Sequence, residues 1–153
     1  MENSLNQERD KHLQFVGAFY YAKERFDIDM ARKQFAIWEV DGEEYKLKLK
    51  TSTLCDLEEK LGTSLMNVLG NGNMPALKIM LTITHYAIKD YNANIKFKDV
   101  QDLFDKYLDG GGSQLEFFTK VLMDVYKVSG FFTEAQAEMM EERQEKAEEM
   151  LQG

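Results

Sequence analysis

Between residues 35 and 50, hydrophobic and polar positions alternate along the chain. Tyr45, Leu47 and Leu49 share one side, and lysines occupy the positions between and after them. Alternation with a period of two is typical of a β-strand with one buried face. Asp41-Gly42 lies between this run and an earlier run of aromatic and β-branched residues, and this dipeptide favours a two-residue turn because glycine tolerates a positive φ. The pattern therefore predicts a β-hairpin.

After the hairpin, the spacing of hydrophobic residues changes to three and four, which is typical of helices with one apolar face. Leu54, Leu57, Leu61, Leu65 and Leu69 follow this spacing. Glycine-rich and asparagine-rich breaks then interrupt the pattern, and each break predicts the end of a helix. The predicted helices cover about residues 54–61, 64–69, 75–89, 98–108, 113–128 and 133–151.

Several of these boundaries carry a capping signal. Thr51–Thr53 offer hydroxyl groups for the start of the first helix, and Gly62 suits the C-terminal cap of that helix. Pro75 is expected in the first turn of the third helix, where its missing N–H costs no hydrogen bond. Ser113 and Thr133 each have Glu or Gln three residues later, which is the spacing of a capping box.

Two of the predicted helices are expected to supply much of the core. The helix over 75–89 has a broad apolar band, so we expect it to be the central and most buried one. The helix over 113–128 has an apolar face with the ordinary helical period. The residues expected to face inward there are Leu115, Phe118, Val121, Leu122, Val125 and Tyr126.

The chain is predicted to have three parts. Residues 1–34 place four large apolar side chains on one face, which favours an appended helix packed on the hairpin over a disordered tail. Residues 35–130 form the hairpin and the helical core, and residues 131–153 form an acidic C-terminal helix. The predicted fold is mainly α: an N-terminal β-hairpin, a bundle of about five to six short helices, and an extra N-terminal helix.

The last predicted helix differs from the others in composition. From residue 133 onward the chain has seven glutamates and two basic residues, and its apolar positions are mostly alanine and methionine. One interpretation is a solvated terminal helix. The other is an adaptable surface for a partner, because methionine side chains fill irregular gaps. The candidate client-binding residues are Phe131, Phe132, Met139 and Met140.

The hairpin offers a candidate surface for self-association. An edge strand presents unpaired backbone groups that can pair with a second copy, and Tyr45, Leu47 and Leu49 would supply the contact. In the alternative interpretation, the same three side chains face the core of their own chain.

Composition narrows the classes of partner. The net charge is −8 and the isoelectric point about 4.8, which argues against nucleic acid because phosphate binding needs a cationic face. No window approaches about 18 uninterrupted apolar residues, so no membrane span is expected. The first residues are polar and acidic, unlike a secretory signal. A single cysteine, Cys55, excludes an internal disulfide and fits a reducing compartment.

The sequence carries no recognisable catalytic, cofactor-binding or metal-binding pattern. His85 lies among core positions of a helix, where we interpret it as a structural residue. Cys55 has no histidine near it in sequence, and we expect it to be buried or half-buried without a chemical role. Gly110–Gly112 lack the Lys-Ser/Thr that follows in a phosphate-binding loop, so they are interpreted as a helix stop. We therefore expect a protein that is not an enzyme.

Residues 35–130 resemble the tail assembly chaperones of long-tailed bacteriophages and prophages of Gram-positive hosts. The resemblance depends on a short hairpin, a leucine-rich helical segment and a helix started by proline. The residues that carry it are Tyr45-Lys46-Leu47-Lys48-Leu49, Leu57-Glu58-Glu59-Lys60-Leu61-Gly62, Ser64-Leu65 and Pro75. Residues 1–34 and the acidic last helix lie outside the resemblance.

The resemblance implies a non-catalytic protein that binds and solubilises the helical, apolar tape-measure protein before the tail tube polymerises. It also implies a homo-oligomer that acts in the host bacterial cytoplasm and is absent from the mature virion. An acidic surface would keep such a complex in solution, because a net charge far from zero opposes aggregation.

Two other functions remain open from the sequence. A small helical phage-encoded adaptor or inhibitor would bind one host protein with fixed stoichiometry. A structural tail component would be found in purified particles. The chaperone would instead form multimers and bind helical segments with apolar stripes.

Overall fold

The computed structural model describes residues 7–9, 11, 33–70 and 72–152. The chain divides into two units, Met1–Arg32 and Lys33–Gly153. In the first unit, residues 7–9 and 11 are helical, and the rest of the expected N-terminal helix lies outside the described residues. The second unit contains the hairpin, the central helices and the acidic last helix together.

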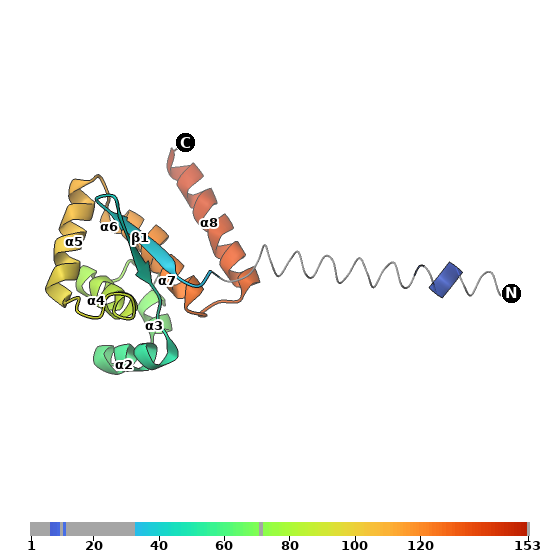
Figure 1. The fold of residues 1–153 in the computed structure, drawn as a ribbon. Coiled ribbons are helices and arrows are strands. Elements are labelled where there is room, and N and C mark those ends of the chain that lie inside the picture. The colour runs from blue at the N-terminus through green and yellow to red at the C-terminus, as the bar shows by residue number, and fades with distance from the viewer. Residues whose placement is uncertain (1–6, 10, 12–32, 71, 153) are drawn as a thin grey trace. The chain divides into compact units, whose positions relative to one another are not determined.

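The second unit is mainly helical and begins with a two-stranded antiparallel hairpin, which confirms the predicted fold class. Figure 1 shows the hairpin beside α4, α5 and α7, with α8 as the last helix of the chain. The elements are β1 (Ala36–Val40), β2 (Glu43–Leu47), α2 (Thr51–Leu61), α3 (Leu65–Leu69), α4 (Leu77–Ile88), α5 (Phe97–Asp109), α6 (Gln114–Glu116), the π-helix η1 (Phe117–Leu122), α7 (Met123–Val128) and α8 (Glu134–Gln152).

The hairpin turn has the geometry that Asp41-Gly42 predicts. Val40 pairs with Glu43, so the loop contains two residues. Asp41 has φ 52° and Gly42 has φ 79°, and positive values at both positions match the twist of the flanking strands. The turn therefore fixes the register that places Ala36, Trp38 and Val40 in the core.

The core forms between the hairpin and the central helices. In α4, seven residues are buried, which agrees with the expectation of a central helix. The N–H of Lys48 donates to the carbonyl oxygen of Ala87 at 2.9 Å, so the segment after β2 lies directly against this helix. Trp38 is fully buried and contacts the rings of Tyr107 and Phe117 at centroid distances of 6.0 and 5.2 Å.

The helix ends agree with most of the capping signals. Gly62 has φ 69° as the C-cap of α2, a conformation that glycine adopts without steric strain. The Ser113 hydroxyl accepts a hydrogen bond from the N–H of Glu116. Thr133 and Gln136 form a reciprocal capping box with bonds of 2.9 and 3.2 Å.

Two capping predictions were wrong. The N-cap of α2 is Lys50, and the hydroxyl groups of Thr51–Thr53 lie inside the helix rather than before it. Pro75 lies outside α4, whose N-cap is Ala76. Pro75 is buried, so at this position its apolar ring packs in the loop before the helix.

The inward face predicted for residues 113–128 was also partly wrong. Leu115 is 59 % exposed and Phe118 is half-buried, whereas Phe117 is fully buried. This segment is the π-helix η1, in which hydrogen bonds span five residues instead of four. Phe117 is buried together with Val121 and Val125, so the buried face begins one residue earlier than predicted.

Candidate functional site: an apolar groove beside the π-helix

Two of the three candidate self-association residues lie in the core. Leu47 is 0 % exposed and Leu49 is 2 % exposed, and Tyr45 is half-buried beside Trp38. The hydroxyl of Tyr45 donates to a carboxylate oxygen of Glu43 at 2.9 Å. The side chains of Leu47 and Leu49 therefore face their own core, as the alternative interpretation expects, and offer no free surface to a second copy.

The candidate client-binding residues lie on both sides of the start of α8. Phe131 and Phe132 are half-buried against Tyr126, with ring centroids 4.8 and 6.4 Å from that of the tyrosine. Both rings therefore belong mainly to the junction between α7 and α8. Met139 is 54 % exposed, and Met140 is half-buried on the other side of the helix.

Met140 contributes to a groove that the sequence did not reveal. This hollow, which we call the apolar groove, has a volume of about 270 Å³. Its walls come from the end of α3, the loop after it, η1, α7 and α8. The lining residues are Leu69, Gly72, Asn73, Phe118, Thr119, Met123, Lys127 and Met140. Most of the lining is apolar, and two methionines give it an adaptable surface.

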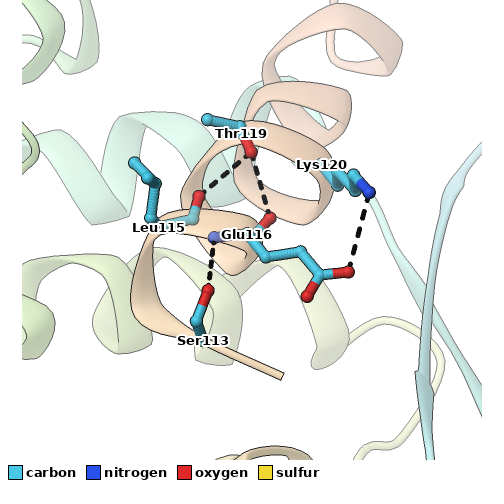
Figure 2. A network of polar contacts seen from close by, with 5 residues as sticks. All are labelled: Ser113, Leu115, Glu116, Thr119 and Lys120. Carbon is cyan, nitrogen blue, oxygen red and sulfur yellow. Dashed lines mark hydrogen bonds and ion pairs between the residues drawn. The ribbon is translucent and has the colours of Figure 1, made fainter. Parts of the chain in front are cut away.

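The π-helix shapes one wall of this groove. Along η1, Phe117 lies in the core while the neighbouring Phe118 and Thr119 line the groove. The Thr119 hydroxyl donates to the carbonyl oxygen of Leu115 at 3.0 Å and lies 3.4 Å from that of Glu116 (Figure 2). This bond satisfies a carbonyl near the point where the regular helical ladder is interrupted.

The same turn carries an exposed ion pair. The Lys120 ammonium lies 3.7 Å from the Glu116 carboxylate, four residues earlier (Figure 2). Both side chains are well exposed to water, so we expect the pair to add only a few tenths of a kcal/mol to stability. The backbone hydrogen bonds and the burial of Phe117 therefore decide the shape of η1.

An ion pair holds α8 against the groove. The Lys127 ammonium lies 2.7 Å from the Glu141 carboxylate, next to Met140 in sequence. The Lys127 side chain is only 17 % exposed, so water screens this pair less than an ordinary surface pair. This contact fixes α8 on α7 at the position where Met140 lines the groove.

The opposite wall is fixed by Tyr126. Its hydroxyl donates to the carbonyl oxygen of Leu65 at 2.9 Å, which joins α7 to the first residue of α3. Burial of the phenol raises the pKa of Tyr126 well above its ordinary value, and the charge of Glu58 raises it further. The phenol therefore keeps its proton and continues to donate this hydrogen bond over the whole neutral range.

The residues considered for chemistry have other surroundings. His85 places Nε2 3.0 Å from the carbonyl oxygen of Ile95, which agrees with a structural role. Cys55 is exposed, so the expectation of a buried or half-buried thiol was wrong. In the described part of the chain, no group of three or more His, Cys, Asp or Glu side chains could hold a metal ion.

One comparison with known proteins gives a match. Residues 31–152 match a family described as a family of unknown function (DUF6096). The chain belongs to this family. The matched region includes the hairpin, the apolar groove and all of α8, so every residue of the groove lies within the DUF6096 region. Comparison with curated proteins and with solved structures gave no match.

The groove residues of this DUF6096 protein were difficult to find from the sequence. Phe118 and Leu69 were assigned to the apolar faces of their helices, and Met123 gave no signal of its own. Met140 was the one groove residue singled out as a candidate binding residue, from the unusual composition of the last helix.

No helix among the described residues has the length and apolar character needed to cross a membrane.

Proposed function

We propose that this protein is a non-catalytic tail assembly chaperone of a long-tailed phage or prophage, which binds the tape-measure protein before the tail tube polymerises. The sequence resemblance over residues 35–130 supports this proposal. The client is a long helical protein with apolar stripes, and the chaperone covers those stripes in the host bacterial cytoplasm. The finished virion does not contain it.

The observation that carries the proposal is the apolar groove with Met123 and Met140 in its walls. Its volume of about 270 Å³ lies below the range of roughly 300–1,000 Å³ for small-molecule sites. A groove of this size takes one or two large apolar side chains from a partner helix. Such anchors recur at spacings of three and four residues when an amphipathic helix lies in a groove.

The modest size of the groove suits a temporary cover. One or two anchors give weak binding, so a growing tube can displace a single copy. Several copies along one client bind more strongly together, because each bound copy raises the effective concentration of the next site. The methionines allow one groove to accept different apolar side chains along the client.

A second candidate function is a small regulatory adaptor that binds one folded host protein. The same groove would serve it, since an apolar helix of the target could insert in the same way. The two functions differ in stoichiometry. An adaptor would bind its target with one fixed ratio, whereas a chaperone would load many copies onto one extended client.

The test is co-expression of the full chain with the tape-measure protein encoded in the same phage or prophage genome. We expect co-purification and a complex mass that corresponds to several copies per client. Met140→Asp should reduce the retained client by about tenfold, because it replaces an apolar wall of the groove with a carboxylate that must lose water when an apolar side chain binds. Met66→Asp is the matched control, because Met66 is exposed and lies outside the groove lining.

Failure to retain the tape-measure protein would overturn the proposal, as would equal loss of binding in both variants. A complex with one copy of this chain and one folded host protein would favour the adaptor. Mass spectrometry of purified particles gives an independent check. If the protein is present there in stoichiometric amounts, it is a structural tail component instead.

A further inference from the structure

A second hollow on the described surface is lined by lysine side chains. This hollow, which we call the lysine pocket, has a volume of about 220 Å³ and lies between α2, α4 and the start of α5. Its rim carries Lys60, Lys78 and Lys89, and its aromatic lining comes from His85, Tyr86 and Phe97. Three ammonium groups in one hollow are unexpected in a chain with 27 acidic and 19 basic residues.

These three lysines have no acidic partner among the described residues. Ion pairs in that part of the chain involve other lysines, such as Lys50 with Asp90 and Lys127 with Glu141. The Lys89 ammonium instead lies 3.9 Å from the centre of the Tyr86 ring, and a cation–π contact leaves the positive charge available to an anion. The pocket therefore combines three positive side chains with aromatic side chains in one lining.

The helix α8 carries the complementary pattern. Glu138, Glu142, Glu145 and Glu149 are exposed and recur at intervals of four, three and four residues, so they form one acidic stripe. Lys78, the buried Thr82 and His85 on α4, with Lys89 as its C-cap, have the same intervals. The first and last residues of each row are eleven positions apart, which is about 16 Å along a helix. The two rows therefore match in length, and the lysines at the two ends of one row are opposite in charge to the glutamates of the other.

The α8 helix of the same chain is held elsewhere. Its Glu141 pairs with Lys127 on α7, and its Met140 lines the apolar groove. No residue of α8 lines the lysine pocket. In Figure 1, α8 and the pair α4 and α5 lie on opposite sides of the hairpin within the second unit. The acidic stripe of one molecule is therefore free to meet the lysine pocket of another.

We propose that the lysine pocket binds the acidic stripe of α8 from a second copy of this chain. The contact joins two different surfaces, so each copy keeps one free pocket and one free stripe. Such head-to-tail contacts build a ring if the rotation closes and an open chain if it does not. The inference rests on the proposed function in one respect. A protein that covers a long client with many copies needs self-association, and this contact supplies it.

The overall charge of the protein favours this occupant over nucleic acid. A net charge of −8 repels a polyphosphate at long range, and three lysines form too small a patch to neutralise many phosphates. Two copies of this chain carry the same net charge and repel each other at long range. The contact between them therefore depends on short-range pairing of lysine and glutamate side chains. Salt at 1 M, where the Debye length is about 3 Å, should therefore weaken the assembly.

The test measures the mass of the purified full chain by analytical ultracentrifugation at low salt, without any client. We expect multimers for the natural chain. Lys78→Glu with Lys89→Glu should raise the dissociation constant by about tenfold or more, and Glu142→Lys with Glu145→Lys should do the same. An equimolar mixture of these two variants should restore multimers, because each reversed surface then meets its complement.

Lys46→Glu with Lys106→Glu is the matched control, because it changes the net charge equally at exposed positions outside the pocket lining. Circular dichroism should show the same folded spectrum for all variants.

A natural chain that stays a monomer would overturn the inference, as would multimers that persist in the pocket variant or a mixture that stays dissociated. Binding of inorganic phosphate or an oligonucleotide to the pocket, with no multimers, would assign it to another anion. Client binding through the apolar groove is measured separately and can succeed or fail independently.

Discussion

The indole of Trp38 packs edge-on against the ring of Phe117, with the two ring centroids 5.2 Å apart. Both side chains are fully buried, and the contact joins β1 to η1 across about eighty residues of sequence. The indole Nε1 is buried without a hydrogen-bond partner among the described residues. The contact therefore depends on apolar packing and ring geometry, and it fixes which residue of the π-helix enters the core.

The first prediction concerns which side chain of this segment is buried, Phe117 or Leu115. Phe117→Ala should lower the free energy of unfolding by about 3–5 kcal/mol, because it leaves a cavity beside Trp38. Leu115→Ala should change it by less than about 0.5 kcal/mol, since that side chain is mostly exposed. Urea unfolding followed by tryptophan fluorescence measures both. If Leu115→Ala proved the more damaging change, the buried face would contain Leu115, as the sequence predicts, instead of Phe117.

The burial of Leu47 gives the second prediction. Leu47→Asp should abolish cooperative unfolding of the single chain, because it places an unpaired carboxylate in the core. Ile37→Asp on the paired strand is the control, since Ile37 is 46 % exposed, and its thermal transition should remain. Light scattering and circular dichroism that both stay unchanged in Leu47→Asp would show that the position is not buried.

The third prediction concerns the last helix. Deletion of residues 133–153 should leave a cooperatively folded protein, because the described contacts of α8 with α7 consist mainly of the Lys127–Glu141 pair and the packing of Met140. The same deletion removes one wall of the apolar groove and the whole acidic stripe, so client retention and self-association should both fall. Loss of the cooperative thermal transition would instead show that α8 belongs to the core.

The fourth prediction is a loss of stability at alkaline pH. The pKa of Tyr126 is raised in the folded protein, first by burial and then by Glu58. The unfolded chain releases this proton near pH 10 while the folded chain keeps it, so the stabilisation is complete below pH 10 and declines as the pH rises further. The expected decline is about 1.4 kcal/mol per pH unit.

The phenols of Tyr45 and Tyr107 also have raised pKa values, each mainly because of burial, so they add to this decline. Tyr126→Phe separates the contributions. It should cost about 1 kcal/mol at neutral pH, through the lost hydrogen bond to the carbonyl oxygen of Leu65. Its stability should then fall less steeply between pH 10 and 11. An equal slope in both proteins would show that Tyr126 ionises normally.

Much of the backbone architecture was predictable because it depends on local signals. Asp41-Gly42 favours positive φ values, and the structure has them at both residues. The αL conformation of Gly62 and the Thr133–Gln136 capping box likewise involve residues that are close in sequence. Predictions failed where a local signal had to compete with packing, as for Lys50 as the N-cap of α2 and for Pro75 outside α4.

The candidate sites were less predictable because they depend on which side chains remain at the surface. Alternation singled out Leu47 and Leu49 but could not decide between their own core and a second copy, and their burial in the folded chain decided it. Composition singled out Met140, whereas Phe118, which was expected to face inward, lines the same groove. The lysine pocket combines residues from three helices, and no single stretch of sequence reveals it.

By itself, the sequence determined the hairpin, the order of the helices and the acidic character of the last one, because hydrophobic period, turn residues and charge act over a few neighbouring positions. The tertiary structure alone decided that Phe117 packs on Trp38, that Phe118 and Met140 share a groove and that three lysines converge. These relationships join residues far apart in the chain, and they arise only when the helices pack around one core.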